Sequence, residues 1–290
     1  MTVAEACRRG EGRLTAAGID AARVDARLLM AHALGLSPAT LPLRSRETIP
    51  ADSAEVYAAA VSRRVAREPL AYITGDTEFM GFRFRCDPRA LVPRPDTETL
   101  VLLAAHLLSA FAPDRPTIVD VGTGTGCIGV SLARILPHST VLLTDISPDA
   151  LALATENARA NGVREQVRPL CGAFLCPVLH AGLAADVVAV VSNPPYVPAG
   201  ELAGLEPEVS RHEPRIALDG GPDGLDAFRR LLRQAVDLPA LRLLALEVGI
   251  GQAEEVARMM ADHFRGWAVQ VRADLGGVPR VVWTQRSAGG

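Results

Sequence analysis

From residue 117 onward, the chain alternates short apolar runs with stretches of helical periodicity. TIVDV at 117–121 precedes a helical stretch at 127–135, and VLLTD at 141–145 precedes another at 148–160. Further apolar runs occupy 186–192, 241–247, 267–271 and 281–283. Such alternation is typical of βαβ units, in which helices cover both faces of a parallel sheet. The sequence therefore predicts an α/β fold with a largely parallel sheet.

The segment before this α/β region has a different pattern. Apolar residues recur at helical spacing through 1–71, which predicts a small helical domain punctuated by prolines. In 72–92, phenylalanines alternate with polar residues around Gly81, as in a β-hairpin that links two domains. Residues 93–290 then form the α/β domain, and a chain of 290 residues is long enough for both domains.

Composition and charge limit the partners and the cellular compartment that we expect. The net charge is -3 and all 30 basic residues are arginine, which weighs against a nucleic-acid partner. The five cysteines are scattered without metal-ligand spacing, so we expect free thiols in a reducing compartment and no metal. The N-terminal stretch has no apolar core typical of a signal peptide, and no run of 18 apolar residues occurs. We therefore expect a cytoplasmic protein.

A glycine-rich turn follows the first strand of the α/β region. The run is Val119-Asp120-Val121-Gly122-Thr123-Gly124-Thr125-Gly126, and a helix comes directly after it. Glycines adopt the dihedral angles that such a turn needs and let a ligand approach the backbone. A purely structural strand-to-helix turn is the alternative on this feature alone.

Asp145 favours the ligand interpretation. It ends the second strand, 19 residues after Gly126, where an acidic side chain accepts hydrogen bonds from both ribose hydroxyls of a nucleotide. A helix N-cap for the segment from Pro148 is the alternative, and the two roles are compatible. The chain has no phosphate-binding loop and no lysine, which suits a sulfonium cofactor without phosphates. Asp120 is placed to interact with the charged end of such a cofactor.

The tetrapeptide Asn193-Pro194-Pro195-Tyr196 follows a fully apolar strand, at the sheet edge where ligands bind in open α/β folds. Its residue types suit a planar amide or amine nitrogen, whose delocalised lone pair is a poor nucleophile. The Asn193 side-chain carbonyl and the Pro194 backbone carbonyl can accept its two N–H groups. These acceptors strengthen as the nitrogen gains positive charge, and Tyr196 can cover the planar group with its ring. A proline turn with a local asparagine cap is the alternative.

In this order, the GTGTG loop, Asp145 and the NPPY tetrapeptide resemble the class I methyltransferases that modify planar nitrogens. The segment 91–98, LVPRPDTE, is similar to the signature of the release-factor glutamine methyltransferases, the PrmC or HemK family. The same pattern continues in 213–218, 220–225, 247–249 and 274–277, so the resemblance spans nearly the whole chain. It implies a Rossmann-like methyltransferase sheet with an N-terminal helical domain and a linking hairpin.

The resemblance also implies the activity and its partners. It implies N5-methylation of the glutamine in the Gly-Gly-Gln motif of peptide chain release factors, with S-adenosyl-L-methionine converted to S-adenosyl-L-homocysteine. Residues 122–126, Asp145 and Asn193 would contact the cofactor, and 193–196 would hold the glutamine. The helical domain would grip the release factor. We expect a monomer without a nucleic-acid or membrane partner.

Some positions depart from the family pattern, and the roles of others stay open. Gly172 and Ala173 replace the polar and bulky residues usual before Phe174, so we expect Ala173 and Phe174 to contact the cofactor by packing alone. Arg94 and Glu98 either line the acceptor pocket or form a surface pair at i, i+4. The ribosomal-protein glutamine methyltransferases, nucleic-acid amino-group methyltransferases and a non-enzymatic binding module are the competing interpretations.

Overall fold

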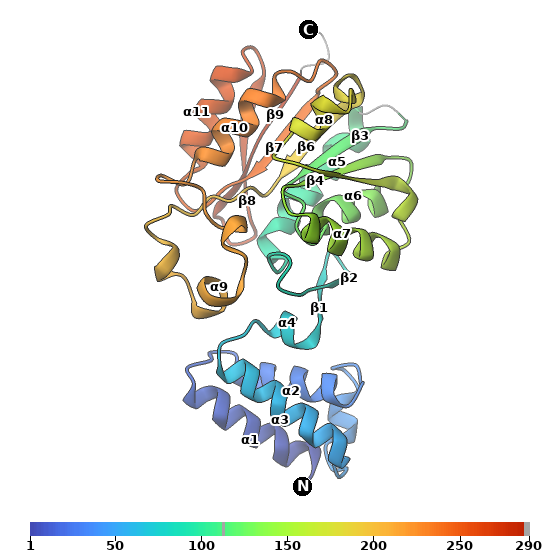
Figure 1. Ribbon diagram of the computed structural model, residues 1–290, viewed down its shortest axis with the longest axis vertical. Coiled ribbons are helices and arrows are strands. Elements are labelled where there is room, and N and C mark those ends of the chain that lie inside the picture. Colours follow the sequence, from blue (N-terminus) through green and yellow to red (C-terminus); the bar gives the residue numbers. More distant parts are fainter. Residues whose placement is uncertain (112–113, 287–290) are drawn as a thin grey trace. The chain divides into compact units, whose positions relative to one another are not determined.

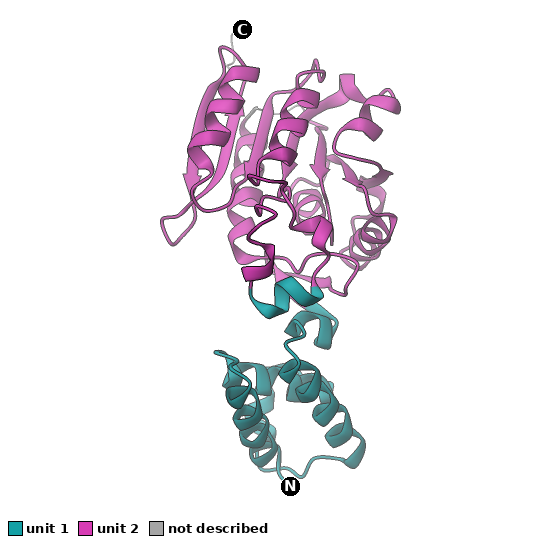
Figure 2. Cartoon of the chain, turned by 60° about the vertical axis from the view of Figure 1, so that its left-hand side comes forward, with its two compact units in different colours: residues 1–76, 206–212 teal, residues 77–205, 213–290 magenta. Residues whose placement is uncertain are grey.

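The computed structural model describes residues 1–111 and 114–286, and the chain forms two compact units (Figure 2). The first unit comprises Met1–Asp76 and Glu206–His212, and the second comprises Thr77–Leu205 and Glu213–Gly290. This division differs from the sequence-based one, which assigned all of 93–290 to a single domain. Residues 206–212 group with the N-terminal helices although they are distant from them in sequence. The segment 72–92, expected as a separate linker, is divided between the two units after Asp76.

The first unit is a bundle of helices around an apolar core (Figure 1). Its elements are α1 (Val3–Ala16), α2 (Ala22–Ala33), a 3₁₀ turn (Leu41–Arg44), α3 (Ala51–Val65), α4 (Leu70–Thr74) and α9 (Pro207–His212). Thr2 and Glu5 start α1 with a capping box, in which each side chain accepts the other's backbone N–H. Leu14, Leu29 and Met30 are fully buried between the helices. The helical N-terminal region expected from the periodicity is thus confirmed.

Buried ion pairs hold α9 within this unit. Arg64 donates from Nε to Asp25 Oδ2 and from Nη1 to Glu208 Oε1, and both donor–acceptor distances are 2.7 Å. Arg67 Nη2 lies 2.7 Å from Glu208 Oε2. Burial alone would raise the pKa of Glu208, but the hydrogen bonds from Arg64 and Arg67 outweigh it and hold that pKa below its ordinary value. The carboxylate is therefore charged at neutral pH and anchors α9.

Arg64→Ala is expected to destabilise α9 and the helices it packs on by about 3–5 kcal/mol, because two buried carboxylates lose their shared partner. The side chains of Arg64, Asp25 and Glu208 are only 10%, 7% and 14% exposed, so water replaces the lost contacts poorly. Hydrogen exchange resolved by peptide in α3 and α9 measures the opening free energy. Arg44→Ala is the control, because the Arg44–Glu47 pair is about half exposed. Equal protection in the two variants would contradict the anchoring role.

Within residues 77–111 and 114–286, seven strands form one sheet in the order β5-β4-β3-β6-β7-β9-β8. They are β3 (Thr117–Val121), β4 (Thr140–Asp145), β5 (Val167–Cys171), β6 (Val187–Ser192), β7 (Leu243–Glu247), β8 (Ala268–Ala273) and β9 (Pro279–Gln285). The strands β5, β4, β3, β6 and β7 pair in parallel, and β9 pairs antiparallel with both β7 and β8. The α/β class and the largely parallel sheet are confirmed. The strand order reverses between β3 and β6, where ligands bind in such folds.

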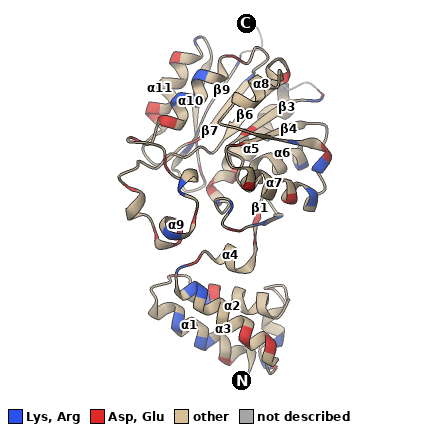
Figure 3. Ribbon diagram, in the orientation of Figure 1, with Lys and Arg blue, Asp and Glu red and all other residues tan. Residues whose placement is uncertain are grey.

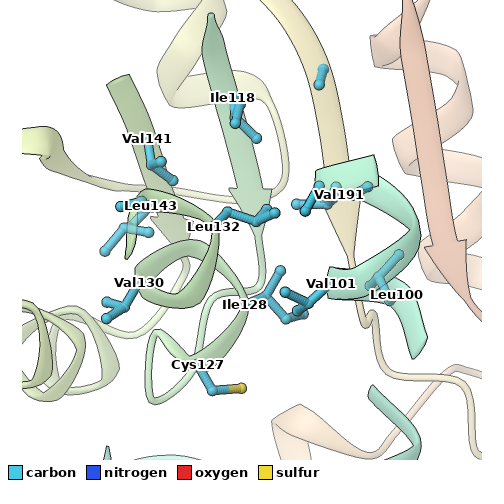
Figure 4. Packing of buried hydrophobic residues seen from close by; sticks show 14 of the residues in the cluster. Leu100, Val101, Ile118, Cys127, Ile128, Val130, Leu132, Val141, Leu143 and Val191 are labelled. Carbon is cyan, nitrogen blue, oxygen red and sulfur yellow. The ribbon is translucent and has the colours of Figure 1, made fainter. Parts of the chain in front are cut away.

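Alternate residues of each central strand face opposite layers of helices, as the two-residue period of a strand requires. Ile118 of β3 packs in one apolar cluster with α5 (Glu98–Phe111), α6 (Cys127–Ile135) and α7 (Pro148–Ala160) (Figure 4). Val119 belongs to the opposite cluster with α8 (Cys176–His180), α10 (Asp226–Ala235) and α11 (Ala253–His263). Both faces are therefore covered, which explains why the central strands are almost wholly apolar.

The strands β1 (Asp76–Phe79) and β2 (Phe82–Arg85) form a two-stranded hairpin. This confirms the hairpin that the alternating phenylalanines predicted. Phe79 and Phe84 are buried edge to face, with ring centroids 6.0 Å apart. The sequence did not predict β5, because Arg168 and Pro169 interrupt its apolar pattern. Proline is tolerated there because β5 lies at the edge of the sheet.

Charge is mixed on the helices of the first unit, where acidic and basic residues both occur along α1, α2 and α3 (Figure 3). Among the helices in 1–111 and 114–286, none combines the length and the apolar composition that crossing a bilayer requires.

Candidate functional site

The glycine-rich loop between β3 and α6 has the backbone that its sequence predicts. Gly122, Gly124 and Gly126 all have positive φ angles, of +69°, +54° and +82°. The N–H groups of Gly122 and Thr123 both donate to the Thr144 carbonyl, over 2.8 and 3.0 Å. A Cβ at Gly126 would stand 3.0 Å from that of Ala154 on α7. Glycine is thus required both by the turn and by close packing against α7.

Asp120 braces this loop from within. Its Oδ2 accepts from Thr123 Oγ1 over 2.6 Å and from the Gly129 N–H over 2.9 Å. The side chain is fully buried, and this burial raises the pKa of Asp120 to about 6. Its Oδ1 has no hydrogen-bond partner among the described residues. Asp120 therefore shapes the loop, whereas the sequence interpretation had it facing the cofactor.

Asp145 connects the end of β4 to the same loop. Its Oδ2 accepts from the Gly124 N–H over 3.0 Å, and its Oδ1 accepts from the Ser147 N–H over 2.9 Å. Burial raises the pKa of this carboxyl above its ordinary range. The alternative role as a helix cap belongs to Ser147, whose hydroxyl accepts from the Ala150 N–H at the start of α7. Each carboxylate oxygen of Asp145 thus keeps one further lone pair for a ligand.

A cavity of about 570 Å³ opens at the carboxyl ends of β3, β4 and β6. The expected cofactor residues on its wall are Gly122, Gly124, Asp145, Ala173, Phe174 and Asn193, and the expected acceptor residues are Asn193, Pro194 and Pro195. Its lining does not include Asp120, Thr123, Thr125, Gly126 or Tyr196. The cavity thus brings residues from the two halves of the expected site together.

Phe174 reaches this wall from an unusual backbone conformation. Its φ is +52°, which is a strained value for a bulky residue, and Gly172 before it has φ +153°. The Gly172 N–H donates to the Asp145 carbonyl over 2.9 Å, and the Leu175 N–H donates to Gln234 Oε1 over 2.8 Å. Strain held by such contacts is common at ligand sites. Packing by Phe174 therefore remains the expected contact at this end of the cavity.

The NPPY turn is held from several sides. Asn193 donates from Nδ2 to Thr97 Oγ1 over 3.2 Å, and Gln252 Nε2 donates to the Tyr196 carbonyl over 2.9 Å. A Cβ at Gly220 would stand 2.8 Å from Tyr196 Cα, and one at Gly224 would stand 2.4 Å from the Tyr196 carbonyl oxygen. The segment 220–224 therefore lies directly against the turn, and its glycines allow that approach.

Arg94 and Glu98 do not form the surface pair at i, i+4. Arg94 Nη2 lies 2.5 Å from Glu213 Oε2, and Glu213 Oε1 also accepts from the Val92 N–H over 3.3 Å. Glu98 Oε1 instead accepts from the Met80 N–H in the hairpin turn over 2.7 Å. Neither residue lines the cavity. Glu213 thus connects its own segment to the one that contains Val92 and Arg94. Leu91 and Pro214, which are next to these residues in the chain, do line the cavity.

Some residues that shape the site have weak signals in the sequence. Thr97 and Glu213 belong to the segments that carried the family resemblance, but no local rule gave them a role. Gln252 carried no signal, because it lies in the turn before α11 and reaches Tyr196 only through the fold. In the part of the chain that the structure describes, no cluster of three His, Cys, Asp or Glu residues could hold a metal ion.

Comparisons with known proteins give matches along most of the chain. Residues 5–75 match the family described as the PrmC N-terminal domain, and 94–204 match the methyltransferase small domain. The chain is 40% identical to a release factor glutamine methyltransferase of Deinococcus radiodurans over 100% of both chains. It is 44% identical to one of Moorella thermoacetica, over 88% of each chain.

Solved structures share the fold at much lower identity. The hMettl16 catalytic domain, in complex with a MAT2A 3'UTR hairpin, superposes with a TM-score of 0.56 at 14% identity over 82% of both chains. A human methyltransferase 10 domain containing protein gives 0.51 at 15% identity, over 71% of this chain and 88% of that one. These similarities support the Rossmann-like methyltransferase fold and nothing finer.

Proposed function

This chain belongs to the release factor glutamine methyltransferases, and from that premise we propose that it methylates N5 of the glutamine in the Gly-Gly-Gln motif of peptide chain release factors. S-adenosyl-L-methionine is the proposed methyl donor, and S-adenosyl-L-homocysteine is the product. The observation that carries the proposal is that Gly124, Asp145 and the Asn193-Pro194 pair line one and the same cavity. Because the substrate belongs to translation, we place the reaction in the cytoplasm.

The residues on the cavity wall fit this cofactor. The Asp145 carboxylate keeps free lone pairs for two ribose hydroxyls after its bonds to Gly124 and Ser147. A Cβ at Gly122 would meet nothing within 4 Å, so the loop backbone there is open to a ligand. Phe174 and Ala173 offer apolar contact for a flat base. When bound, the sulfonium methyl group supplies the electrophile.

The chain's part in the transfer is to hold the acceptor amide. The Asn193 Oδ1 and the Pro194 carbonyl accept the two N–H groups of the glutamine side chain and direct its nitrogen. Proline fixes the backbone φ and keeps that carbonyl rigid. As the nitrogen gains positive charge, both acceptors bind it more strongly than in the ground state. The proton leaves after alkylation, so no strong base is required.

Label transfer tests the proposal directly. Incubating the protein with methyl-labelled cofactor and a purified release factor, followed by peptide mass spectrometry, should place the label on the Gly-Gly-Gln glutamine. A release factor with that glutamine changed to alanine is the control. Label on ribosomal proteins or nucleic acid, with none on the release factor, would identify one of the competing activities instead.

We further propose that the helical unit grips the body of the release factor. Deleting residues 1–70 should then lower kcat/KM for the intact release factor by at least about tenfold more than for a short Gly-Gly-Gln peptide, equivalent to about 1.4 kcal/mol of lost binding. The peptide controls for damage to the catalytic unit, because the deletion also leaves α9 without Arg64 and Arg67. An equal loss on both substrates would refute the docking role.

A further inference from the structure

A buried polar cluster lies against the side chain of Asn193. Asn193 Nδ2 donates to the hydroxyl of Thr97, whose residue is only 2% exposed. Glu247, at the end of β7, is 1% exposed, and its carboxyl group lies close enough to the Thr97 and Asn193 side chains for both to lower its pKa. Its Oε2 has no closely aligned partner among the described residues. A buried carboxyl that is so incompletely paired is costly, and therefore suggests a function.

The chemistry of these groups sets the direction of their hydrogen bonds. A carboxylate only accepts, so the single hydroxyl proton of Thr97 is drawn toward Glu247. The Thr97 oxygen then accepts from the Asn193 amide, and the NH₂ end of that amide faces Thr97. The Oδ1 of Asn193 is left to accept from a substrate. A protonated Glu247 can instead donate, and the direction is then no longer enforced.

We propose that Glu247 and Thr97 are positioning residues for the methyl transfer, and that they fix the orientation of the Asn193 amide through this directed hydrogen-bond chain. The inference deepens the proposed function and rests on it, since the oriented oxygen is the one assigned to the glutamine amide. Neither side chain lines the cavity, so both act through Asn193.

The charges around Glu247 give the cluster a dependence on pH. Burial raises the pKa of Glu247 to about 7, while Thr97, Arg280 of β9 and Asn193 oppose the rise and Asp96 adds to it. Arg280 is itself paired with Asp96 and Asp274, over 2.9 and 3.0 Å. Tyr196 and Cys127 of α6 also interact with the Glu247 charge, and burial raises the pKa of both. The charged form of Glu247, and with it the enforced orientation, is therefore lost as the pH falls below about 7.

Kinetics of matched variants test the chain of hydrogen bonds. Thr97→Val keeps the side-chain shape but loses the hydroxyl, and we expect kcat on the release factor to fall about tenfold. Thr97→Ser keeps the hydroxyl and should restore kcat, while cofactor affinity stays within about twofold in both variants. Glu247→Gln should lower kcat at pH 8 and remove its decline below pH 7. The double variant should be no slower than the slower single one. Equal kcat in the serine and valine variants would overturn the proposal.

A spectroscopic measurement judges the inference without any substrate. The chain has three asparagines, Asn157, Asn161 and Asn193, so selective ¹⁵N-asparagine labelling gives few side-chain amide signals. The Asn193 signal, assigned by its loss in Asn193→Ala, should shift with a midpoint near pH 7 in the native protein and stay fixed in Glu247→Gln. A static Asn193 signal in the native protein would overturn the inference. Failure of the native enzyme to label a release factor would refute the proposed function instead, whatever the titration shows.

Discussion

Asn193→Ala should lower kcat on a release factor by about 10²- to 10³-fold, the range found when one preorganised polar contact to a transition state is removed. The substitution deletes the Oδ1 that accepts from the glutamine amide, and that contact strengthens only as charge develops. It leaves Gly124 and Asp145 unchanged, so the Kd for S-adenosyl-L-methionine should change little. Single-turnover kinetics with saturating cofactor and calorimetric titration separate the two quantities.

Asn161→Ala is the matched control for this measurement. Asn161 caps the end of α7 and donates to the Arg83 carbonyl over 3.0 Å, outside the cavity lining. Its replacement should leave kcat near the native value. A near-native kcat in Asn193→Ala would contradict the amide-holding mechanism, and a large loss of cofactor affinity would show instead that Asn193 serves mainly the cofactor.

The catalytic half of the fold was predictable because its strands are buried on both faces. Burial leaves β3, β4, β6 and β7 as nearly continuous apolar runs, and the helices between them keep a clear period. The edge strand β5 lacks this signal, since only part of it is covered and it carries Arg168 and Pro169. Local pattern therefore identified the layers of the fold, and it failed where burial no longer constrains each residue.

The contacts that assemble the site were less predictable than its motifs. The Gly-rich loop, Asp145 and the NPPY turn are each contiguous in sequence, and each has a local physical reason for its residue types. The bonds from Arg94 to Glu213 and from Gln252 to Tyr196 join segments 119 and 56 residues apart. Such pairs follow from tertiary packing, and propensity and periodicity do not predict contacts between residues that are distant in sequence.

The same limit explains Asp120 and α9. Asp120 is adjacent to the ligand-binding turn in sequence, but the buried carboxyl is used by Thr123 and Gly129 within the loop. Helix α9 is short and polar, so its sequence pattern does not predict where it packs. It belongs to the first unit because Glu208 forms ion pairs with Arg64 and Arg67. Proximity along the chain thus identified the site region, while the role of each side chain depended on its partners.

Asp145→Ala should weaken S-adenosyl-L-methionine binding by about 10²-fold or more, because hydrogen bonds to a charged acceptor contribute about 1.5–3 kcal/mol each. Asp145→Asn should lose less, since its carbonyl oxygen still accepts and its shape is kept. Glu165→Ala, at an exposed position before β5, is the control and should bind normally. Calorimetric titration with S-adenosyl-L-homocysteine gives the affinities without turnover.

The pH dependence of cofactor binding gives a second test of the contact between Asp145 and the ribose. Burial raises the pKa of Asp145, and a carboxylate that accepts from ribose hydroxyls binds them best when charged. Cofactor affinity should therefore fall as the pH drops through that raised pKa, and the fall should be smaller in Asp145→Asn, which carries no titrating group there. Asp120 also titrates in this loop, with a pKa of about 6 that the nearby Asp145 charge helps to raise, so its titration moves to lower pH in Asp145→Asn. Identical pH profiles, or native affinity in Asp145→Ala, would refute the proposed contact between Asp145 and the ribose. The proposed orientation of the cofactor toward Asn193 would then lose its support.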